Sequence, residues 1–499
     1  MNSTSDHPPK ASGAPAKGRT VQDLTTGPIG RTLILFALPV MGSNILQSLN
    51  GSANAIWVSH ALGEEALAAT SNANNVMFLM LGAVFGVSMS ANLMIAQAVG
   101  ANDRNLAKKV VGTSTSFFLM LSLGVGAAGW LLTPGILTAM GAPGDARQQA
   151  IDYLRVIFLA MPFMYFFSFV MMAQRGTGDS RTPFWFSLFA VALDVALNPV
   201  LIMGIGPAPR LGVAGSATAT LISQSLTLGL MLVHLYRQGS VLVLRPADWP
   251  LLKPDLSVVR ALVFKGLPMA MQMLVVSGAA VVMISFVNRY GSHTAAAYGA
   301  AIQLWTYVQM PAMALGAAVS SMAAQNVGAG RMDRVDKVAH SGVAYALVFT
   351  AAPVLAIYAV EPWILRLFLP ATSPSLPIAM HINAFALWGF IPLGAAFVLF
   401  GVVRATGAVV APLVILFISM WLVRIPFTGY FQQTMGAEAV WWSFPMGSAV
   451  SCALALAYYR WGGWRKARLM ETAPHGQAAD TGMAPPDMDD EAALARREP

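Results

Sequence analysis

Long apolar stretches separated by short polar segments run along most of the chain. Each stretch exceeds the ~20 residues that a helix needs to cross the hydrocarbon core of a bilayer. A backbone in lipid must satisfy its own hydrogen bonds, and the alternating pattern of a transmembrane barrel is absent, so helices are expected. Twelve spans are predicted: 32–58, 68–98, 110–133, 151–173, 183–203, 212–236, 262–287, 295–326, 338–360, 378–403, 409–431 and 440–461. The pattern therefore predicts an all-α integral membrane protein.

Composition agrees with this fold class. Hydrophobic residues make up 56% of the chain and charged residues 10%, which are too few charges to cover a soluble globule of this length. The single Cys452 lies in the last expected span, which excludes an internal disulfide and argues against a thiolate metal site. The seven histidines are scattered and form no H-E-x-x-H pair, so neither a metal nor a cofactor is expected.

Lysine and arginine are divided unequally between the two sides of the expected bundle. With the N-terminus placed in the cytoplasm, 24 of the 30 Lys and Arg residues fall on that side, five on the other, and Arg424 within a span. The positive-inside rule therefore predicts a multi-pass protein of a bacterial-type inner membrane with both termini in the cytoplasm. The net charge of +8 mostly reflects this asymmetry. No basic cluster with interleaved aromatics indicates a nucleic-acid partner.

The chain repeats itself at an offset of 228 or 229 residues. Three pairs carry the repeat: Leu38-Pro39 with Leu267-Pro268, "AQAVGA" (96–101) with "AQNVGA" (324–329), and "RGTGDSRTP" (175–183) with "RATGAVVAP" (404–412). The order and spacing predict two six-helix lobes. Because each lobe crosses the membrane an even number of times, the lobes should be related by a pseudo-two-fold axis along the membrane normal, with sites at their interface. Pro39 and Pro268 are expected to bend the lead helix of each lobe.

The repeat sets the expected domain organisation. An N-terminal lobe at 31–236 and a C-terminal lobe at 262–461 are joined by a cytoplasmic linker at 237–261. Residues 1–30 lack the apolar core of a cleavable signal peptide and are expected to be a disordered cytoplasmic tail. Residues 462–499 are expected to be a second cytoplasmic tail, mostly disordered.

In these motifs the chain resembles the multidrug and toxic compound extrusion (MATE) family of secondary efflux transporters. The residues that carry the resemblance are the two "LP" openings, "NAIWVSHALGEEALAAT" (54–70), the two "Q-x-V-G-A" motifs, "RGTGDSRTP", "LNPVLIMG" and "GVAGSATAT" (212–220). The resemblance covers about 31–461. It implies twelve helices in two lobes, a V-shaped central cavity, and export driven by inward flow of protons or sodium.

The chain also departs from the family pattern. Asn54 occupies the position where family members usually have an aspartate in the first helix, and the usual Asn-then-Asp order of the fifth helix is reversed as Asp194 and Asn198. Many sodium-linked members carry an acid in the seventh and tenth helices, but 262–287 and 378–403 contain none. The coupling residues of the family therefore cannot be transferred as a set, and a sodium site in the C-terminal lobe is disfavoured.

Asp194 lies near the middle of the apolar stretch 186–204, with no cation near it in sequence. An ionised carboxylate at that depth costs ~2.5–3.5 kcal/mol on insertion scales, and an intramembrane acid is by default a functional candidate. Asn198 at i+4 shares its helix face and is expected to donate to the carboxylate; Asn54 would reach it under the family packing. No other acid lies in the middle of an expected span; the rest map to loops, tails or helix ends. Asp194 is thus the expected proton-coupling site, the alternative being a permanently protonated hydrogen-bond partner between helices.

Substrate-cavity candidates are weaker. Arg424 is the other intramembrane charge; it would pair with Asp194, bind an anionic cargo group, or reach an interface, and the resemblance, whose members often carry a similar R-x-P sequence, favours a structural role for it. The remaining candidates are polarisable or aromatic side chains suited to varied apolar guests: Met77, Gln303, Trp305 and Tyr307.

The function expected from these observations is antiport: export of small amphiphilic or cationic drug-like compounds in exchange for protons, by a monomer. Sodium-coupled antiport and a flippase for lipid-linked saccharides of the same superfamily are the alternatives. An intramembrane aspartyl protease is rejected although "GTGD" (176–179) matches its motif, because Asp179 lies between two arginines in a turn and lacks a second intramembrane aspartate. A channel is disfavoured because nothing resembles a selectivity filter.

Overall fold

The computed structural model describes residues 23–139, 144–370 and 372–469; the outer parts of both expected tails, 1–22 and 470–499, lie outside the described residues. The first nine of the twelve spanning segments in this part of the chain are single helices: α1 (Ile29–Leu62), α2 (Glu64–Gly100), α3 (Arg104–Ala139), α4 (Gly144–Thr177), α5 (Arg181–Met203), α6 (Val213–Gln238), α7 (Leu256–Asn288), α8 (Ser292–Gly328) and α9 (Met332–Leu365). The last three are α10 (Ser375–Ala386) continued by η2 (Leu387–Gly389) and α11 (Phe390–Ala405); α12 (Val410–Phe417) continued by η3 (Ile418–Arg424) and α13 (Ile425–Met435); and α14 (Glu438–Trp461).

The predicted all-helical membrane fold is confirmed. Every expected span coincides with one of these segments, and the observed helices mostly extend a few residues further into the polar flanks. Glycines end two of the helices: Gly204 after α5 and Gly239 after α6 adopt the left-handed conformation, where a Cβ would be strained.

One spanning helix is more polar than the others. Eleven helices of the described residues are long and apolar enough to cross a membrane by length and composition, and α8 is not among them. The polar composition of α8 has a physical reason: residues 318–326, near its C-terminal end, are all buried in protein. A helix surrounded by protein does not need a lipid-facing surface, so it tolerates Gln325 and Asn326 in its buried last turn.

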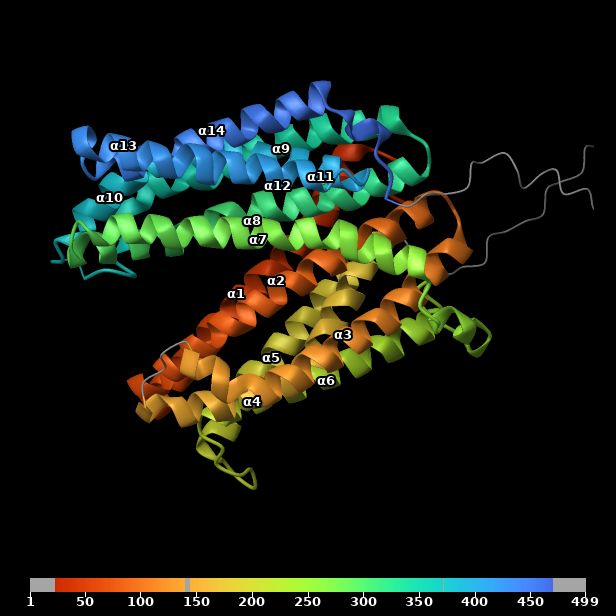
Figure 1. The fold of residues 1–499 in the computed structure, drawn as a ribbon, viewed down its shortest axis with the longest axis horizontal. Helices are drawn as coiled ribbons and strands as arrows, with labels where there is room; N and C mark the ends of the chain where they lie inside the picture. The colour runs from red at the N-terminus through yellow and green to blue at the C-terminus, as the bar shows by residue number, and fades with distance from the viewer. Residues whose placement is uncertain (1–22, 140–143, 371, 470–499) are drawn as a thin grey trace, which may run out of the picture. The chain divides into compact units, whose positions relative to one another are not determined.

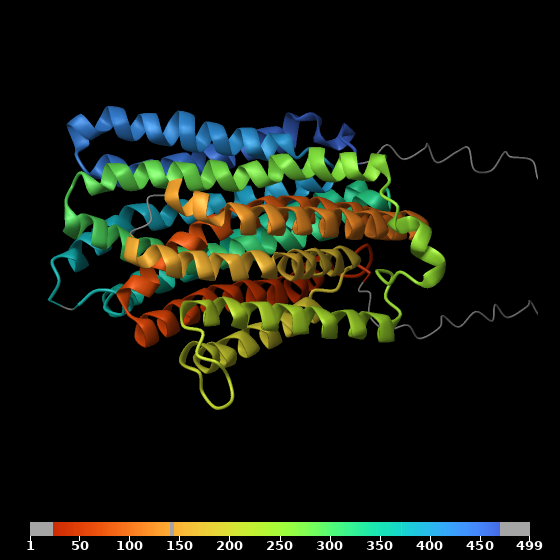
Figure 2. The same cartoon turned by 60° about the horizontal axis from the view of Figure 1, so that its bottom comes forward.

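The helices are arranged in two bundles, with α1–α6 in one and α7–α14 in the other (Figure 1). Within the first, α4 packs against α2, α3 and α6; within the second, α8 packs against α9 and α11. The first helix of each bundle also contacts the other bundle: α7 packs mainly on α2, and α1 packs on α8 as well as on α5. Figure 2 shows the same bundles turned by 60°.

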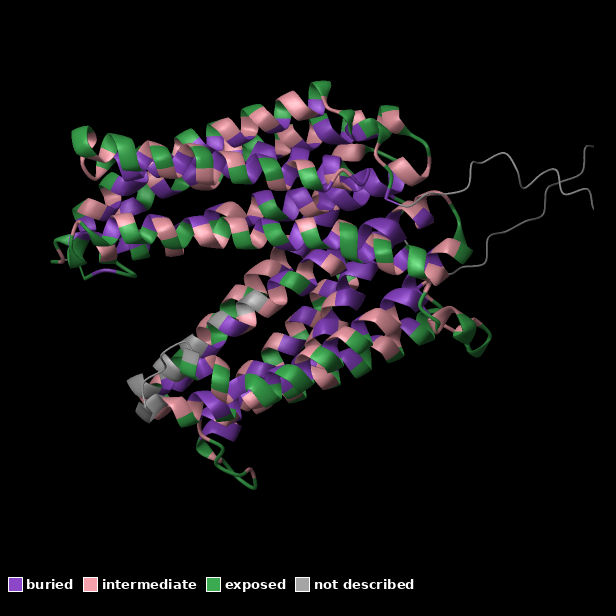
Figure 3. Ribbon diagram, in the orientation of Figure 1, coloured by how far each residue is buried: buried purple, intermediate pink, exposed green. Residues whose placement is uncertain are grey.

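The bundles meet along two faces that carry glycine. Residues 88–96 of α2 are all buried, like 318–326 of α8, and Figure 3 shows buried residues in the region where these helices lie. A Cβ at Gly86 would lie only 2.5 Å from the Gly266 carbonyl oxygen of α7, so glycine is required for this close approach.

The segment between the bundles docks on α3. It contains a short helix, η1 (Pro246–Leu252), and the Ser116 hydroxyl donates to the carbonyl of Leu252 over 2.5 Å. Lys108 pairs with Asp248 and Lys109 with Asp255, each at 2.8 Å. Donation by Lys108 holds the pKa of Asp248 below its usual range. The predicted linker therefore folds against the N-terminal bundle.

Candidate functional site

Asp194 lies in the interior of the N-terminal bundle, where α1, α5 and α6 meet. Its side chain is only 1% exposed, although both neighbours along the chain are apolar. The helix crossings that bury it are the contacts of α5 with α1 and with α6. Each of these helices contributes polar side chains to the carboxyl group, so the acid is buried without being left in an apolar environment.

Four side chains surround the carboxyl group. Asn54 Nδ2 donates to Asp194 Oδ2 over 3.1 Å, and Asn50, one helical turn earlier on α1, is also hydrogen-bonded to the group. From α6, Thr220 Oγ1 lies 3.1 Å and Ser223 Oγ 3.5 Å from Oδ1. The contact with Asn54 predicted from the sequence is thus present in the structure.

The two hydroxyls can serve either protonation state of the acid. Thr220 Oγ1 also lies 3.3 Å from the Ser216 carbonyl oxygen, and Ser223 Oγ lies 3.1 Å from the Thr220 carbonyl oxygen. When Asp194 is ionised, both hydroxyls can donate to it; when it is protonated, they can donate to these carbonyls, and one of them can accept a hydrogen bond from the acid's O–H. Hydroxyl hydrogens rotate freely, so this change needs no movement of heavy atoms.

Asn198 does not act as expected. Its Nδ2 donates to the side-chain oxygen of Asn54 and to the backbone carbonyl of Asp194, both at 2.9 Å, and not to the carboxylate. The reason is helix geometry: a side chain at i+4 reaches back to the carbonyl of residue i before it reaches that residue's side chain. Asn198 instead orients Asn54, which then donates to the acid. Asn198 is therefore a partner of Asn54 within the cluster.

Arg424 lies in the other bundle, at the end of the π-helical segment η3. Its Nε donates to Ser443 Oγ over 3.4 Å, its guanidinium stacks 5.0 Å from the Phe444 ring centre, and Tyr298 is a further hydrogen-bond partner. These contacts come from α8 and α14, and the side chain is 9% exposed. Arg424 and Asp194 share no partner in these contacts, so the structure does not bring them together.

The other cavity candidates differ in exposure. Trp305 is buried, with its Nε1 donating to Asn383 Oδ1 over 2.8 Å. Tyr307, on the same helix, is 37% exposed, whereas Gln303 and Met77 are half-buried. Their roles in binding cargo stay predictions.

A second buried acid, Glu361, is not among the site residues predicted from the sequence. Glu361 lies inside α9, because that helix runs to Leu365 and not only to 360 as expected, and its side chain is 6% exposed. Asn383 Nδ2 donates to Glu361 Oε1 over 2.8 Å, and the Asn383 side-chain oxygen takes the Trp305 hydrogen bond. Glu361 lies near the end of α9, so Asp194 remains the one acid of the described residues in the middle of a spanning segment. The sequence signal was a lone glutamate at the edge of an apolar run.

The lead-helix prolines lie inside helices as expected: Pro39 in α1 and Pro268 in α7. Matched bends there stay a prediction. Beside Pro39, an apolar pocket opens between α1, α8 and α9, lined in part by Leu38 and Pro311. Its free volume of about 20 Å³ is too small for a drug-sized ligand.

The repeated motifs join the bundles to each other. Gln97 Nε2 donates to the carbonyl of Ala405 over 2.7 Å, and Gln325 Nε2 donates to the carbonyl of Gly176 over 2.9 Å. The two donors are 228 residues apart and the two acceptors 229, so the contacts are equivalent under the repeat. We call these two hydrogen bonds the glutamine latch. The sequence showed both motifs but not which carbonyls they bind.

A second pair of contacts reinforces the glutamine latch. A Cβ added at Gly100 would overlap the backbone carbonyl of Gln325, and one added at Gly328 would overlap that of Gln97. The last turns of α2 and α8 thus touch backbone to backbone. Ser321 Oγ, 3.4 Å from Asn92 Oδ1, adds a contact deeper along the same helices.

Comparison with known proteins supports this two-bundle assignment. The MatE family model matches residues 39–200 and again 268–429, with both ends displaced by 229 residues. Among solved structures, an outward-facing multidrug resistance MATE family transporter of the MOP superfamily superposes with a TM-score of 0.82 at 21% identity, over 90% of this chain and 98% of that one. That likeness shows the fold: twelve helices in two lobes.

Curated relatives extend over the same region. The probable multidrug resistance protein YoeA of Bacillus subtilis is 35% identical over 443 residues, covering 88% of this chain and 95% of that protein. YpnP of the same organism, also named a probable multidrug resistance protein, is 31% identical over 90% of this chain and 98% of that protein. These relatives are transporters rather than enzymes. Because the family model matches more than half of the chain and both relatives exceed 30% identity, the chain belongs to the MatE family of multidrug efflux transporters.

Proposed function

We propose that this protein exports small amphiphilic or cationic compounds in exchange for protons, and that Asp194 is the group that carries the proton. One observation carries the proposal: the carboxyl group is buried among partners that satisfy both of its protonation states. Asn54 donates to it in either state, and the hydroxyls of Thr220 and Ser223 can reverse between donor and acceptor. A group that must gain and lose a proton in each cycle needs both states to be accessible.

Protonation of Asp194 would change the hydrogen bonds that it accepts from α1. Hydrogen bonds from Asn50 and Asn54 to an ionised carboxylate are about twice as strong as those to a neutral acid. Protonation of Asp194 therefore weakens the attachment of α1 to α5. Because α1 also packs on α8 of the other bundle, this change is positioned to alter how the bundles meet.

The same cycle needs the glutamine latch to open. Alternating access moves one bundle relative to the other around a central site. In this conformation the bundles are held together where α2 and α8 end, which is the cytoplasmic side under the proposed orientation of both termini. We assign the latch to the state that is closed toward the cytoplasm of a bacterial-type inner membrane, with the protein acting as a monomer.

Sodium coupling is the second candidate, and a specific observation favours it. The side-chain oxygens of Asn50 and Asn198 are buried and lack a hydrogen-bond donor within the described residues. Sodium prefers several oxygen ligands, and these oxygens lie on the residues that flank the Asp194 carboxylate.

Vesicle transport separates the two. Purified protein in liposomes is given ethidium outside, with the membrane potential clamped by potassium and valinomycin. Ethidium carries a permanent charge, so a pH gradient does not move it directly. We expect uptake with an acidic lumen and none with a sodium-loaded lumen at equal pH. Uptake driven by sodium alone establishes the second candidate, and failure of both gradients with every dye tested contradicts the proposed function.

A further inference from the structure

A cationic cavity lies away from the Asp194 cluster, on the side of the protein where the linker crosses between the bundles. It has a volume of about 410 Å³ and is bounded by the start of α3, the end of α6 and the segment leading into η1. Its charged and polar lining comes from Arg104, Asn105, Lys108, Tyr236, Ser240 and Arg245. Three of these six are cations, and no acid lines the cavity.

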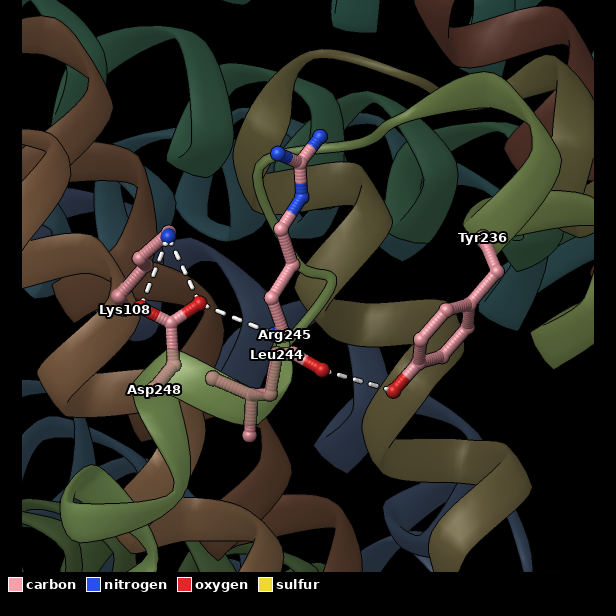
Figure 4. A network of polar contacts seen from close by, with 5 residues as sticks. All are labelled: Lys108, Tyr236, Leu244, Arg245 and Asp248. Atoms are coloured by element: carbon pink, nitrogen blue, oxygen red, sulfur yellow. Dashed lines mark hydrogen bonds and ion pairs between the residues drawn. The ribbon is translucent and has the colours of Figure 1, made fainter.

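Hydrogen bonds hold the residues that line the cavity in place (Figure 4). Lys108 Nζ donates to both carboxylate oxygens of Asp248, at 2.9 and 2.8 Å, and the backbone N–H of Arg245 donates to the same group over 3.0 Å. On the opposite wall the Tyr236 hydroxyl donates to the Leu244 carbonyl over 3.0 Å. These bonds fix the linker between α3 and α6, so the cavity walls are held in place before any ligand arrives.

Two of the three cations form no close ion pair within the described residues, although the charge of Arg245 helps to keep the pKa of Asp248 below its usual range. The ion pairs of the described residues include Lys108 with Asp248, but none involves Arg104 or Arg245. Figure 4 shows the Arg245 guanidinium pointing away from Asp248. The nearest acid in sequence to Arg104 is Asp103, whose carboxylate caps α3 through the N–H of Leu106 at 2.9 Å. Two guanidinium groups that face one cavity are suited to bind phosphate oxygens through paired N–H groups.

The residues around the cavity indicate which class of phosphate-bearing ligand it binds. Large apolar side chains are exposed along η1 and the start of α7: Trp249 is 66% exposed, Leu256 81% and Phe264 66%. Arg260 lies over the Phe264 ring at 5.6 Å. Exposed tryptophan and apolar residues beside arginine are typical of the membrane–water interface. A site at that depth, on the cytoplasmic side of the proposed orientation, faces the headgroups of anionic lipids.

We propose that this cavity binds the phosphodiester headgroup of an anionic phospholipid, with Arg104 and Arg245 as its ligands, while Lys108 holds the linker wall in place through Asp248. A bound lipid would join α3, α6 and the linker through one anion. The site is separate from the proton cluster, so its failure would leave the proposed transport function standing.

The test uses the full-length purified protein and measures its thermal stability as lipid is titrated in detergent. The probes are phosphatidylglycerol, phosphatidylcholine with the same acyl chains, and soluble glycerol 3-phosphate. We expect saturable stabilisation by phosphatidylglycerol at lipid concentrations where the other two have no effect. Equal stabilisation by glycerol 3-phosphate would identify a soluble phosphate as the source of the ligand. Equal stabilisation by phosphatidylcholine would overturn the proposal.

A matched pair of variants assigns the effect to the cavity. Each arginine near an anionic lipid surface contributes about fivefold to affinity, so the double variant Arg104→Gln/Arg245→Gln should bind phosphatidylglycerol about thirtyfold more weakly. Arg260→Gln, which removes a cation from the same side outside the cavity, should bind within about twofold of the parent protein. Unchanged binding by the double variant, or an equal loss in Arg260→Gln, contradicts the site. Ethidium transport by each variant, measured separately, reports whether the protein remains folded.

Discussion

Gly328→Ala should loosen the junction between the bundles, and the structure allows the size of this effect to be calculated. The added Cβ would overlap the carbonyl oxygen of Gln97, and contacts under 3.0 Å are essentially never seen for real Cβ atoms. The last turns of α2 and α8 must therefore separate by roughly 1 Å. The glutamine latch bonds, 2.7 and 2.9 Å long, would then stretch to about 3.7 and 3.9 Å and be lost.

The energetic consequence follows from two lost hydrogen bonds. At ~1 kcal/mol each, the closed arrangement is destabilised by ~2 kcal/mol, which shifts its population against the open one about thirtyfold. Gly299→Ala is the matched control, because it lies in the same helix with nothing within 4 Å of the new carbon. That substitution should instead be neutral or slightly stabilising, as alanine is the better helix former.

Distances between spin labels measure the shift. Labels at the exposed positions Arg181 and Lys337, one on each bundle, are introduced after Cys452→Ser removes the native thiol. Gly328→Ala should move the distance distribution toward the longer, open population, whereas Gly299→Ala should match the parent. Identical distributions for the two alanine variants would refute the reasoning.

Three further outcomes are expected. Gln97→Ala and Gln325→Ala should open the same label pair by similar amounts, ~1 kcal/mol each, because the repeat makes the bonds equivalent; unequal effects would show that the latch is not symmetric. Because the pKa of Asp248 is lower in the folded protein, its ionised form stabilises the docked linker at pH values above its unfolded pKa of 3.8. This stabilisation is lost as the pH falls through the lower pKa of the folded state. Amides of the linker helix should therefore stay protected from pH 7 to about pH 4, and Asp248→Asn should lose that protection throughout. Trp305→Phe removes the hydrogen bond to the buried Asn383 side-chain oxygen and should lower the free energy of unfolding by ~1–3 kcal/mol, as measured by thermal unfolding.

Most of the fold was predictable because its determinants are local. An apolar run long enough to span the bilayer must be helical, so the twelve runs predicted the twelve segments, although α8 is more polar than the others. The boundaries were less certain, and one of them mattered. The charge of Glu361 predicts the end of a span, but a carboxylate that accepts a hydrogen bond from Asn383 can lie inside the end of a helix.

The candidate site was predictable in part. Asp194 was evident from its isolation in an apolar run, and Asn54 from the resemblance. The hydroxyls of Thr220 and Ser223 were not, because small polar residues are common in membrane helices and only tertiary packing shows which of them face an acid. The partners of Gln97 were hidden for the same reason, since backbone acceptors leave no mark in the sequence.

The central claim is that the exchanged proton is carried by Asp194, and proton movement tests it most directly. Liposomes containing a trapped pH indicator and the purified protein are given an ethidium gradient, and the opposing flow of protons is recorded. Asp194→Asn should abolish proton movement while ethidium binding persists, because the amide keeps the hydrogen-bonding shape but cannot exchange a proton. Glu361→Gln should leave proton flow intact, because its hydrogen-bond partner is an amide donor and not a reversible hydroxyl. Proton flow at the parent rate in Asp194→Asn would contradict the account.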